Sequence, residues 1–368
     1  MRVATITCHD VYNYGASLQA YALQQFCEQA GADYHIIDYK PDYLSQHFKL
    51  SVVANPRYNF PIVKQLYLLA KLPGRIRDLK KKRIFDNFTT NYLHLTSTRY
   101  HTCDDIRNSL PEADLYIAGS DQIWNTLFRN GHDSAFYLDF VGSRGKKISY
   151  AASFATDKIH KDADSFVSKM LRNFNEISVR ETSALQLLSK LGQNKATLVC
   201  DPVFLLNRGQ WIQLLKSTIQ PKEDYILVYD CERSSKIRNV ALKLKEQTSL
   251  PIYILSKTAG RYADKDFSLV GPLEFLSLIL NARYVIANSF HATAFSIIFH
   301  KEFFIVNRSE SINTRMHDFL SYLGIPDRII STTTSLNLKP IDFIDVSHKL
   351  DFLINESKSF INKHLQLI

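Results

Sequence analysis

Short apolar runs alternate with stretches of helical spacing along the first 205 residues of the chain. Residues 2–8 predict a buried strand, residues 14–31 a helix that ends at Gly31, and residues 33–40 a second strand. Strand, helix and strand in this order predict the start of a parallel, doubly wound sheet. Further strands are predicted at 113–121, 146–155, 176–181 and 196–206, and helices near 161–172 and at 182–192, the last with Thr182 as its cap.

The second half of the chain repeats this alternation. Strands are predicted at 224–230, 250–256, 282–289 and 302–307, with helices near 235–247, 272–281 and 291–300. The pattern therefore predicts an α/β fold in which two parallel, doubly wound sheets face a cleft. We place the domains at residues 1–205 and 206–345, with a C-terminal helix, 346–368, that packs back on either of them.

Residues 41–100 interrupt the first domain, and four prolines (Pro41, Pro56, Pro61 and Pro73) predict irregular structure there. The segment also holds a basic helix, since residues 64–85 carry eight Lys or Arg against the single acid Asp78. Three interpretations are open: a solvated helix face, a contact with an anionic membrane surface, or a nucleic-acid contact. Leucines and aromatic residues interleave with the charges, which suits a membrane surface. No nucleic-acid recognition motif accompanies the patch, so no nucleic-acid partner is expected.

Composition narrows the class of protein. The chain has 368 residues, 45% of them hydrophobic, and a net charge of +9, which favours anionic partners. No apolar stretch is long enough to cross a membrane, and the N-terminus does not read as a signal peptide. The five cysteines are scattered and form no CxxC pair, so neither disulfides nor a metal site is expected. These features favour a cytoplasmic protein, peripheral at the inner membrane face if the basic helix binds lipid.

Polar motifs follow the predicted strands of the first domain at their carboxyl ends, where doubly wound folds bind ligands. After the first strand, Gly15 permits a tight turn and Ser17 lies where a helix begins, which suits an anion or a sugar hydroxyl. After another strand, Asp121 and Gln122 stand next to Trp124, a combination that binds sugars by stacking and hydrogen bonds. An ordinary loop and a capped helix with a buried Trp are the alternatives.

Two further motifs supply charge. Arg180 ends a short strand and could bind a carboxylate or phosphate, or simply pair with Glu181. Asn288, Ser289 and His291 interrupt the apolar run "VIANSFHATAFSIIFHKEFFIV" between a strand and a helix. The helix start could hold an anion and His291 could donate a proton, unless it is a hydrogen-bonded histidine at a domain seam.

Taken in order, these motifs resemble those of the polysaccharide pyruvyl transferase family. The segments that carry the resemblance are NYGASLQAYAL, AGSDQIWN, SYAASFA, VRETSALQLL, CDPVF and NSFHATAFSIIFHKEFFIV, which span about residues 12–306. The resemblance implies two Rossmann-like domains arranged as in the GT-B glycosyltransferases. It also implies transfer of pyruvate from phosphoenolpyruvate to a sugar hydroxyl pair during exopolysaccharide, capsule or O-antigen biosynthesis. The implied partners are phosphoenolpyruvate and a lipid-linked oligosaccharide, and no metal or other cofactor is required.

The resemblance also assigns expected roles. His291 corresponds to the family's C-domain histidine and is expected to be the acid, while Asp121 would receive the proton of the acceptor hydroxyl or simply bind that sugar beside Trp124. The donor is expected to contact Arg180, Asn288, Ser289, Arg308 and Arg315. The acceptor is expected to contact Asn13, Tyr14, Gly15, Ser17, Gln122, Trp124 and Ser153.

One position departs from the family's pattern. Members often carry an arginine two residues before the histidine, and this chain has Ser289 there, so Arg308 or Arg315 would have to replace that cation. Two other functions therefore stay open. One is a GT-B glycosyltransferase that uses a nucleotide sugar, for which only Glu274 and Glu302 are candidate ribose ligands. The other is a non-catalytic polysaccharide-assembly protein of the same fold.

Overall fold

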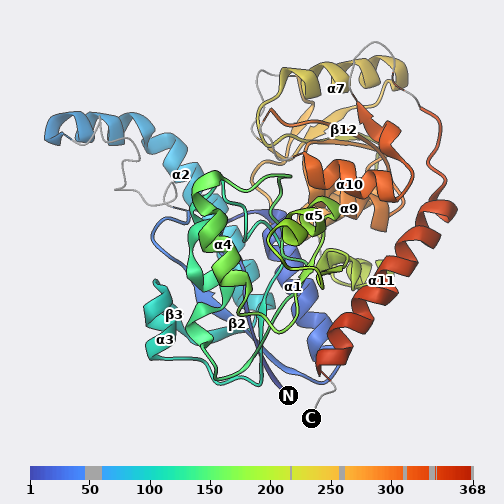
Figure 1. Ribbon diagram of the computed structural model, residues 1–368. Coiled ribbons are helices and arrows are strands. Elements are labelled where there is room, and N and C mark those ends of the chain that lie inside the picture. Colours follow the sequence, from blue (N-terminus) through green and yellow to red (C-terminus); the bar gives the residue numbers. More distant parts are fainter. Residues whose placement is uncertain are drawn as a thin grey trace.

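Each half of the chain builds a parallel sheet with helices packed against it (Figure 1). The computed structural model describes residues 1–45, 60–215, 218–256, 262–309, 313–330, 336 and 338–365. The first sheet has the order β3 (Leu95–Tyr100), β2 (Asp33–Tyr39), β1 (Arg2–Ile6), β4 (Leu115–Ala118), β5 (Lys146–Ser149). The second has the order β10 (Lys265–Asp266), β9 (Ile252–Ile254), β8 (Ile226–Tyr229), β11 (Tyr284–Ala287), β12 (Glu302–Val306), β13 (Ile329–Ile330). A short parallel pair, β6 (Ser178–Val179) and β7 (Thr197–Leu198), continues beyond β5.

The strand orders fix where a ligand can bind. In the first sheet the chain moves from β1 to β2 and β3 on one side and then returns to β4 and β5 on the other. The second sheet does the same around β8 and β11, which pair in parallel with Ile286 opposite Val228. In both sheets the order therefore reverses beside the first strand, and such a reversal opens a crevice at the carboxyl ends of the two strands. The predicted α/β class with parallel, doubly wound sheets is confirmed.

The helices between the strands agree with the predicted positions, with differences at their ends. The chain forms α1 (Tyr14–Gln29), α2 (Pro61–Tyr92), α3 (Cys103–Asn108), α4 (Asp164–Leu171), α5 (Thr182–Lys190), α6 (Arg208–Gln213), α7 (Ser235–Thr248), α8 (Pro272–Asn281), α9 (Phe290–Ile298), α10 (Thr314–Tyr322) and α11 (Phe343–Leu365). The prediction that Thr182 caps α5 is wrong. Glu181 is the N-cap residue but its side chain does not cap the helix, and the Asp318 carboxylate accepts from the Ser183 amide in the first turn at 2.8 Å.

The prediction of irregular structure over residues 41–100 is wrong for most of the described part of that segment. Residues 61–92 form the single helix α2, and β3 follows it as an edge strand of the first sheet. Pro61 begins the helix, a position at which proline loses no hydrogen bond. Pro73 lies inside it, where the lost bond bends a helix without ending it. Residues 46–59, with Pro56, lie outside the described residues.

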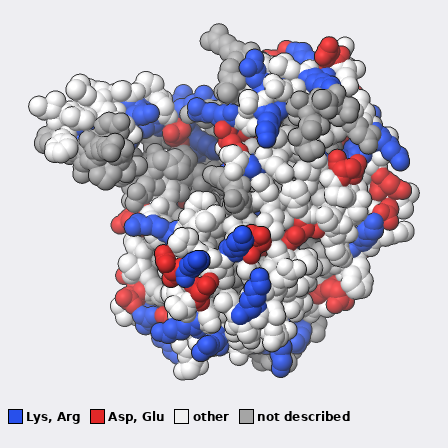
Figure 2. All heavy atoms as spheres, turned by 45° about the horizontal axis from the view of Figure 1, so that its top comes forward, with Lys and Arg blue, Asp and Glu red and all other residues white. Residues whose placement is uncertain are grey.

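Helix α2 leaves the body of the protein at its N-terminal half. Figure 1 shows this half bent away from the first sheet, whereas Phe85 and Phe88, near the C-terminal end, are buried in the core. In Figure 2 the same half forms an arm of mostly white atoms, with blue atoms nearer the body. The basic helix predicted from the sequence is therefore partly anchored and partly projecting.

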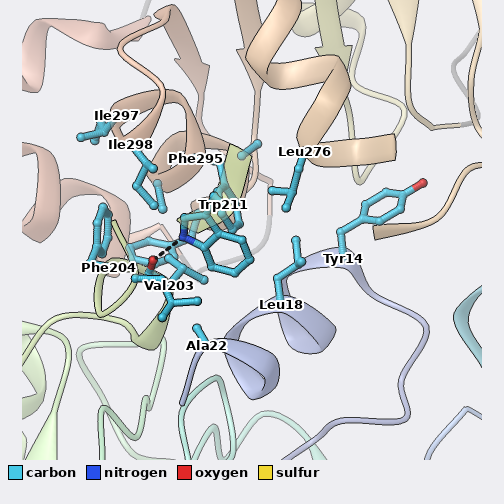
Figure 3. Close-up of a cluster of buried hydrophobic side chains, with 14 of the residues drawn as sticks. Tyr14, Leu18, Ala22, Val203, Phe204, Trp211, Leu276, Phe295, Ile297 and Ile298 are labelled. Carbon is cyan, nitrogen blue, oxygen red and sulfur yellow. Dashed lines mark hydrogen bonds between the residues drawn. The ribbon is translucent and has the colours of Figure 1, made fainter. Parts of the chain in front are cut away.

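A continuous apolar core joins the two halves. Trp211, fully buried on α6, lies between Leu18 of α1 and Phe295 of α9, and its indole nitrogen donates to the Val203 carbonyl at 3.0 Å (Figure 3). Tyr14 extends this cluster, because its ring stacks on Phe275 of α8 at 4.5 Å between ring centres. Helix α1 of the first half thus packs directly on helices of the second half, and this contact fixes the strand ends of the two sheets relative to each other.

Helix α11 returns from the second sheet to the first (Figure 1). The Ser357 hydroxyl accepts a bond from the Cys200 amide at 2.7 Å, and the Lys363 ammonium lies 2.8 Å from Glu176. The sequence left open which half the tail packs on, and α11 contacts both, because the Tyr322 hydroxyl of α10 also donates to the Lys349 carbonyl at 3.2 Å. Residues 366–368 lie outside the described part. None of the described helices combines the length and the apolar character needed to span a membrane.

Candidate functional site at the seam of the two sheets

Two helix starts meet at the seam. Asn13, after β1, caps α1 by accepting bonds from the amides of Gly15 and Ala16 at 2.9 and 3.3 Å. Ser289, after β11, is the N-cap residue of α9, although no side chain caps that helix. Both loops lie at the reversal points of their sheets, so the fold brings two motifs that lie far apart in the sequence into one place.

His291 packs directly on the backbone of α1. A β-carbon added to Gly15 would lie 2.6 Å from Cε1 of His291, and closer still to Nδ1 and Cγ. Only glycine therefore fits beneath this ring. The ring is buried, with 6% of the residue exposed, and Nε2 has no hydrogen-bond partner among the described residues; it faces Asp201 Oδ2 at 3.6 Å. The structure thus brings the predicted Gly15 and His291 into contact.

Arg180 lies at the centre of a buried ionic cluster. Its guanidinium donates to Asp201 and, at 3.0 Å, to Asp121, and its Nε lies 3.5 Å from Glu181. The side chain is only 1% exposed. Sequence reasoning left open whether Arg180 binds a donor or pairs with Glu181. The structure gives it three carboxylates and no open face, so its role here is to hold the cluster together.

Arg315 adds a second cation from α10. Its guanidinium lies 3.8 Å from Asp121, and with the Gln122 amide turned to face it, both terminal nitrogens donate to the Gln122 oxygen at 2.9 and 3.0 Å. The Phe290 ring is close to both guanidinium groups, 4.8 Å from Arg180 and 5.8 Å from Arg315. Of the two arginines considered as replacements for the cation missing at Ser289, Arg315 is the one that reaches the cluster around His291.

The shifts in pKa follow from burial and from these charges. Burial opposes ionisation of Asp121 and Asp201, yet the cations around them, Arg180 and His291 foremost, hold the pKa of both carboxyls below its usual range. Burial outweighs the cations at Glu181 and raises the pKa of that carboxyl. Burial, reinforced by Arg180, lowers the pKa of Arg315 to about 10.

The backbone at Asp121 is also unusual. Its φ of 71° lies in the left-handed region, which Asp tolerates better than most residues. The carbonyl of Asp121 accepts from the amides of Ile123 and Ser153 at 2.7 and 3.1 Å, which holds this conformation. The turn carries the carboxylate from the end of β4 toward Arg180, and strained backbone of this kind is concentrated at functional sites.

A cavity of about 340 Å³ opens at the carboxyl ends of β8 and β9, and the residues of the ionic cluster do not line it. Asn13 lines it from the first sheet, and Asp230 and Cys231 line it from the second. Asn288 holds the loop next to it, since its amide donates to Asp230 at 3.1 Å and accepts from the Cys231 amide at 2.8 Å. The cavity is thus bounded by the same two loops that place Gly15 against His291. Its charged lining comes from the cations Arg77, Lys81 and Arg233 and from the acids Asp78 and Asp230.

Sequence reasoning missed these three cations. Arg233 lies in the left-handed region, with φ 60°, and has no ion-pair or hydrogen-bond partner among the described residues. Arg77 bonds to the Ser268 hydroxyl, and Lys81 lies 5.4 Å from the centre of the Tyr14 ring. Arg233 could have been predicted as a site residue, because the polar segment YDCERSS lies at the carboxyl end of a predicted strand, as the other motifs do. Nothing in the sequence indicates that α2 bends back to this cavity.

Two predicted acceptor contacts are wrong. Trp124 is completely buried, stacked on Tyr137 at 5.5 Å, and its indole donates to the Phe136 carbonyl, so neither ring face is open to a sugar. Tyr14 is buried in the seam core, and its hydroxyl donates to Val270 at 3.2 Å. Both rings are instead packed inside the protein. For Trp124 this is the buried position that the sequence left open as the alternative to a sugar contact.

The remaining predicted residues lie around the cluster in supporting positions. Ser153 is buried and donates to Glu181, and Ser17 is buried in the first turns of α1 without a hydrogen-bond partner among the described residues. Arg308 contacts Glu232 at 3.0 Å, on the loop that follows β8, and is not part of the cluster. Within the described ranges, no group of three or more His, Cys, Asp or Glu side chains is arranged to hold a metal ion.

Comparison with solved structures identifies the fold. The chain is similar to UDP-GlcNAc 2-epimerase of Methanocaldococcus jannaschii in complex with UDP-GlcNAc and UDP, with a TM-score of 0.51, 13% identity and 99% of each chain covered. It is also similar to UGT89C1 of Arabidopsis thaliana, with a TM-score of 0.51, 11% identity, and 100% of this chain and 99% of that chain covered. These identities are too low to carry function, and they establish a GT-B-like fold of two α/β domains.

Comparison with curated proteins gave no match. The family model of polysaccharide pyruvyl transferase, in contrast, matches residues 13–310, from the Asn13 cap of α1 to beyond β12. That range includes the Gly15–His291 contact and the buried ionic cluster except Arg315. The chain therefore belongs to the polysaccharide pyruvyl transferase family.

Proposed function

We propose that this protein transfers the pyruvyl group of phosphoenolpyruvate to two hydroxyls of one sugar and so forms a cyclic ketal. The observation that carries the proposal is a cavity at the carboxyl ends of β8 and β9 that is lined by three cations against two acids, Asp78 and Asp230. Phosphoenolpyruvate is a small trianion, and Arg77, Lys81 and Arg233 line a space of about 340 Å³, which is at the lower end of the size range of ligand pockets. Family membership supports pyruvyl transfer as the reaction class.

The proposed reaction has two additions. A proton is delivered to the methylene carbon of phosphoenolpyruvate, which leaves a cationic carbon next to the carboxylate. One sugar hydroxyl adds to that carbon and loses its proton, and the carbon–oxygen bond to phosphate breaks. The second hydroxyl then adds and loses its proton. The two hydroxyl protons account for the new methyl hydrogen and for the proton carried by the released phosphate.

The residues of the seam have the chemistry that these steps need. His291 is our candidate for the acid, because its Nε2 is unpartnered and faces Asp201 at 3.6 Å. Asp121, whose pKa is held below its usual range against burial chiefly by Arg180, is our candidate to receive the proton of the acceptor hydroxyl. Arg315 contributes a second cation near the developing phosphate charge. The scheme requires neither a metal nor a redox cofactor, and the acceptor we propose is a lipid-linked oligosaccharide.

The glycosyltransferase alternative has less support in the geometry. Both carboxylates considered for a nucleotide ribose already have partners inside the protein. Glu274 accepts from the Gly271 amide at 3.0 Å at the start of α8, and Glu302 binds Arg328 at 3.1 Å and the Ile341 amide at 2.9 Å. Neither one lines the cationic cavity.

Calorimetric titration tests the proposal, with phosphoenolpyruvate as the ligand and UDP- and GDP-sugars as controls. We expect selective binding of phosphoenolpyruvate that weakens about tenfold or more in Arg233→Gln, since a charge-assisted bond contributes about 1.5–3 kcal/mol. Arg208→Gln, on the exposed face of α6, is the matched control and should bind normally. Phosphate release in the presence of candidate sugars then measures turnover, which His291→Ala should abolish.

Other outcomes would decide against the proposal. Tight binding of a nucleotide sugar, also lost in Arg233→Gln, would place the protein among the glycosyltransferases. Binding of phosphoenolpyruvate with no phosphate release from any sugar would favour the non-catalytic assembly role. Normal turnover by His291→Ala would remove this histidine as the acid.

A further inference from the structure

The projecting half of α2 carries an apolar stripe that no described residue covers. Ile62 is 74% exposed, Leu66 63%, Leu69 66% and Ile76 48%. At about 100° per residue these four side chains fall within an arc of about 80° on one side of the helix. Exposed apolar residues scattered singly are normal on a protein surface, but a continuous stripe of this kind marks an interaction site.

The stripe changes chemistry toward the body of the protein. Lys80 and Arg83 lie on the same side of the helix by the same spacing, and both are exposed. The surface therefore runs from apolar at its outer end to basic at its inner end, as Figure 2 shows for the arm as a whole. Residues 64–85 hold eight Lys or Arg and only Asp78 as an acid.

We infer that this stripe docks the protein on an anionic lipid surface. The leucine and isoleucine side chains would enter the boundary between head groups and acyl chains, and Lys80 and Arg83 would meet the lipid phosphates. A second copy of the chain is the competing occupant, but the same basic segment on a partner would offer almost no acidic side chain to neutralise these cations. Charge complementarity thus favours the membrane.

The same helix lines the cationic cavity with Arg77 and Lys81. Docking through α2 would therefore hold the mouth of the site close to the lipid surface, where a lipid-linked sugar would be found. Only this last consequence rests on the proposed function. The docking itself concerns a different surface and is tested without any measurement of activity.

Co-sedimentation of the full chain with vesicles tests the inference. The vesicles are phosphatidylcholine alone or phosphatidylcholine mixed with phosphatidylglycerol. We expect binding to the mixed vesicles that weakens as salt is added, because the basic contribution is screened. The double variant Leu66→Glu/Leu69→Glu should bind roughly a hundredfold more weakly, since two leucines no longer enter the lipid. Lys80→Gln/Arg83→Gln should lose about fivefold for each charge removed.

The control is a double variant that also replaces two exposed leucines by glutamate, but outside α2. Leu127 and Leu242 are also exposed, at 53% and 38%, and Leu127→Glu/Leu242→Glu should bind as the wild type does. Failure of the wild type to bind, equal binding to neutral vesicles, or normal binding by Leu66→Glu/Leu69→Glu would overturn the inference. The inference would also be overturned if light scattering showed a wild-type dimer that does not bind vesicles and that dissociates in Leu66→Glu/Leu69→Glu. A second copy of the chain would then cover the stripe.

Discussion

The contact between Gly15 and His291 predicts an unusual response to a single methyl group. Alanine is a better helix former than glycine by up to about 1 kcal/mol, so Gly15→Ala should stabilise a helix start that had free space around it. Here the new methyl group would lie 2.6 Å from Cε1 of His291, whereas ordinary contact begins at 3.4 Å. The ring must therefore move by more than 0.8 Å, or α1 must shift away from α9.

The magnitude follows from packing. Both sides of the contact are buried, and extra methyl groups in well-packed cores usually cost about 1–3 kcal/mol. After the gain in helix propensity, the net loss of unfolding free energy should be about 0–2 kcal/mol. Activity should fall much further, because a catalytic group displaced by about 1 Å can cost roughly a hundredfold in rate. A small loss of stability with a large loss of turnover is the expected signature.

A double-mutant cycle separates the clash from every other effect of the substitution. Urea unfolding is measured for the wild type, Gly15→Ala, His291→Ala and the double variant. Once the ring is removed, Gly15→Ala should stabilise the protein, so the sign of its effect reverses and the coupling energy is about 1–3 kcal/mol. Equal effects of Gly15→Ala in both backgrounds, or an unchanged rate of phosphate release, would show that His291 does not pack on α1 as the structure has it.

Three further predictions test the surroundings of the site. Arg180→Gln should lower the free energy of unfolding by about 3–5 kcal/mol, because it leaves buried carboxylates without their cation. A loss of less than about 1 kcal/mol, measured by urea titration, would show that Arg180 does not hold the cluster together. Trp124→Phe should cost about 1–3 kcal/mol through the lost bond to Phe136, yet leave the KM for the acceptor unchanged; a raised KM would restore the sugar-stacking interpretation. Burial lowers the pKa of His364 from an ordinary 6.5 to about 4. Below pH 6.5 the unfolded chain therefore binds a proton at this histidine before the folded protein does. The free energy of unfolding is unaffected above pH 6.5 and falls by up to about 2 kcal/mol at about pH 5. His364→Phe should flatten that part of the stability profile, measured by thermal unfolding against pH, and an unchanged profile would exclude this histidine as its origin.

The strands and the helices between them could be predicted from the sequence because each carries its own signal. A parallel strand that is buried on both faces is a short apolar run, and β1, β4, β8 and β11 all read that way. Helix α2 was obscured by Pro73, since a proline that only bends a helix has the same local sequence as one that ends it. Strand β3, an edge strand with three exposed side chains, has too few apolar residues to stand out.

The site was predictable as a set of loops but not as a set of contacts. Fold topology puts the loops after β1, β4 and β11 in one place, so Gly15, Asp121 and His291 could be named together. Which aromatic ring faces a ligand depends on partners distant in sequence, and Trp124 found its partner in Tyr137. Asp201 shows the same difficulty: its carboxylate caps the turn at Pro202 and also binds Arg180 from another loop.

The composition of the buried cluster argues that it was retained for chemistry more than for stability. Burying six ionisable groups costs more than packing apolar side chains of the same volume, and replacing such a cluster by apolar residues is often neutral or stabilising. The apolar cluster around Trp211 already packs the two halves of the chain together, so the fold does not need buried charges to join them. Asp121, Glu181 and Asp201 come from the first half of the chain, whereas Arg315 and His291 come from the second. The buried carboxylates of the first half therefore have cationic partners from the second half only when both halves are in place.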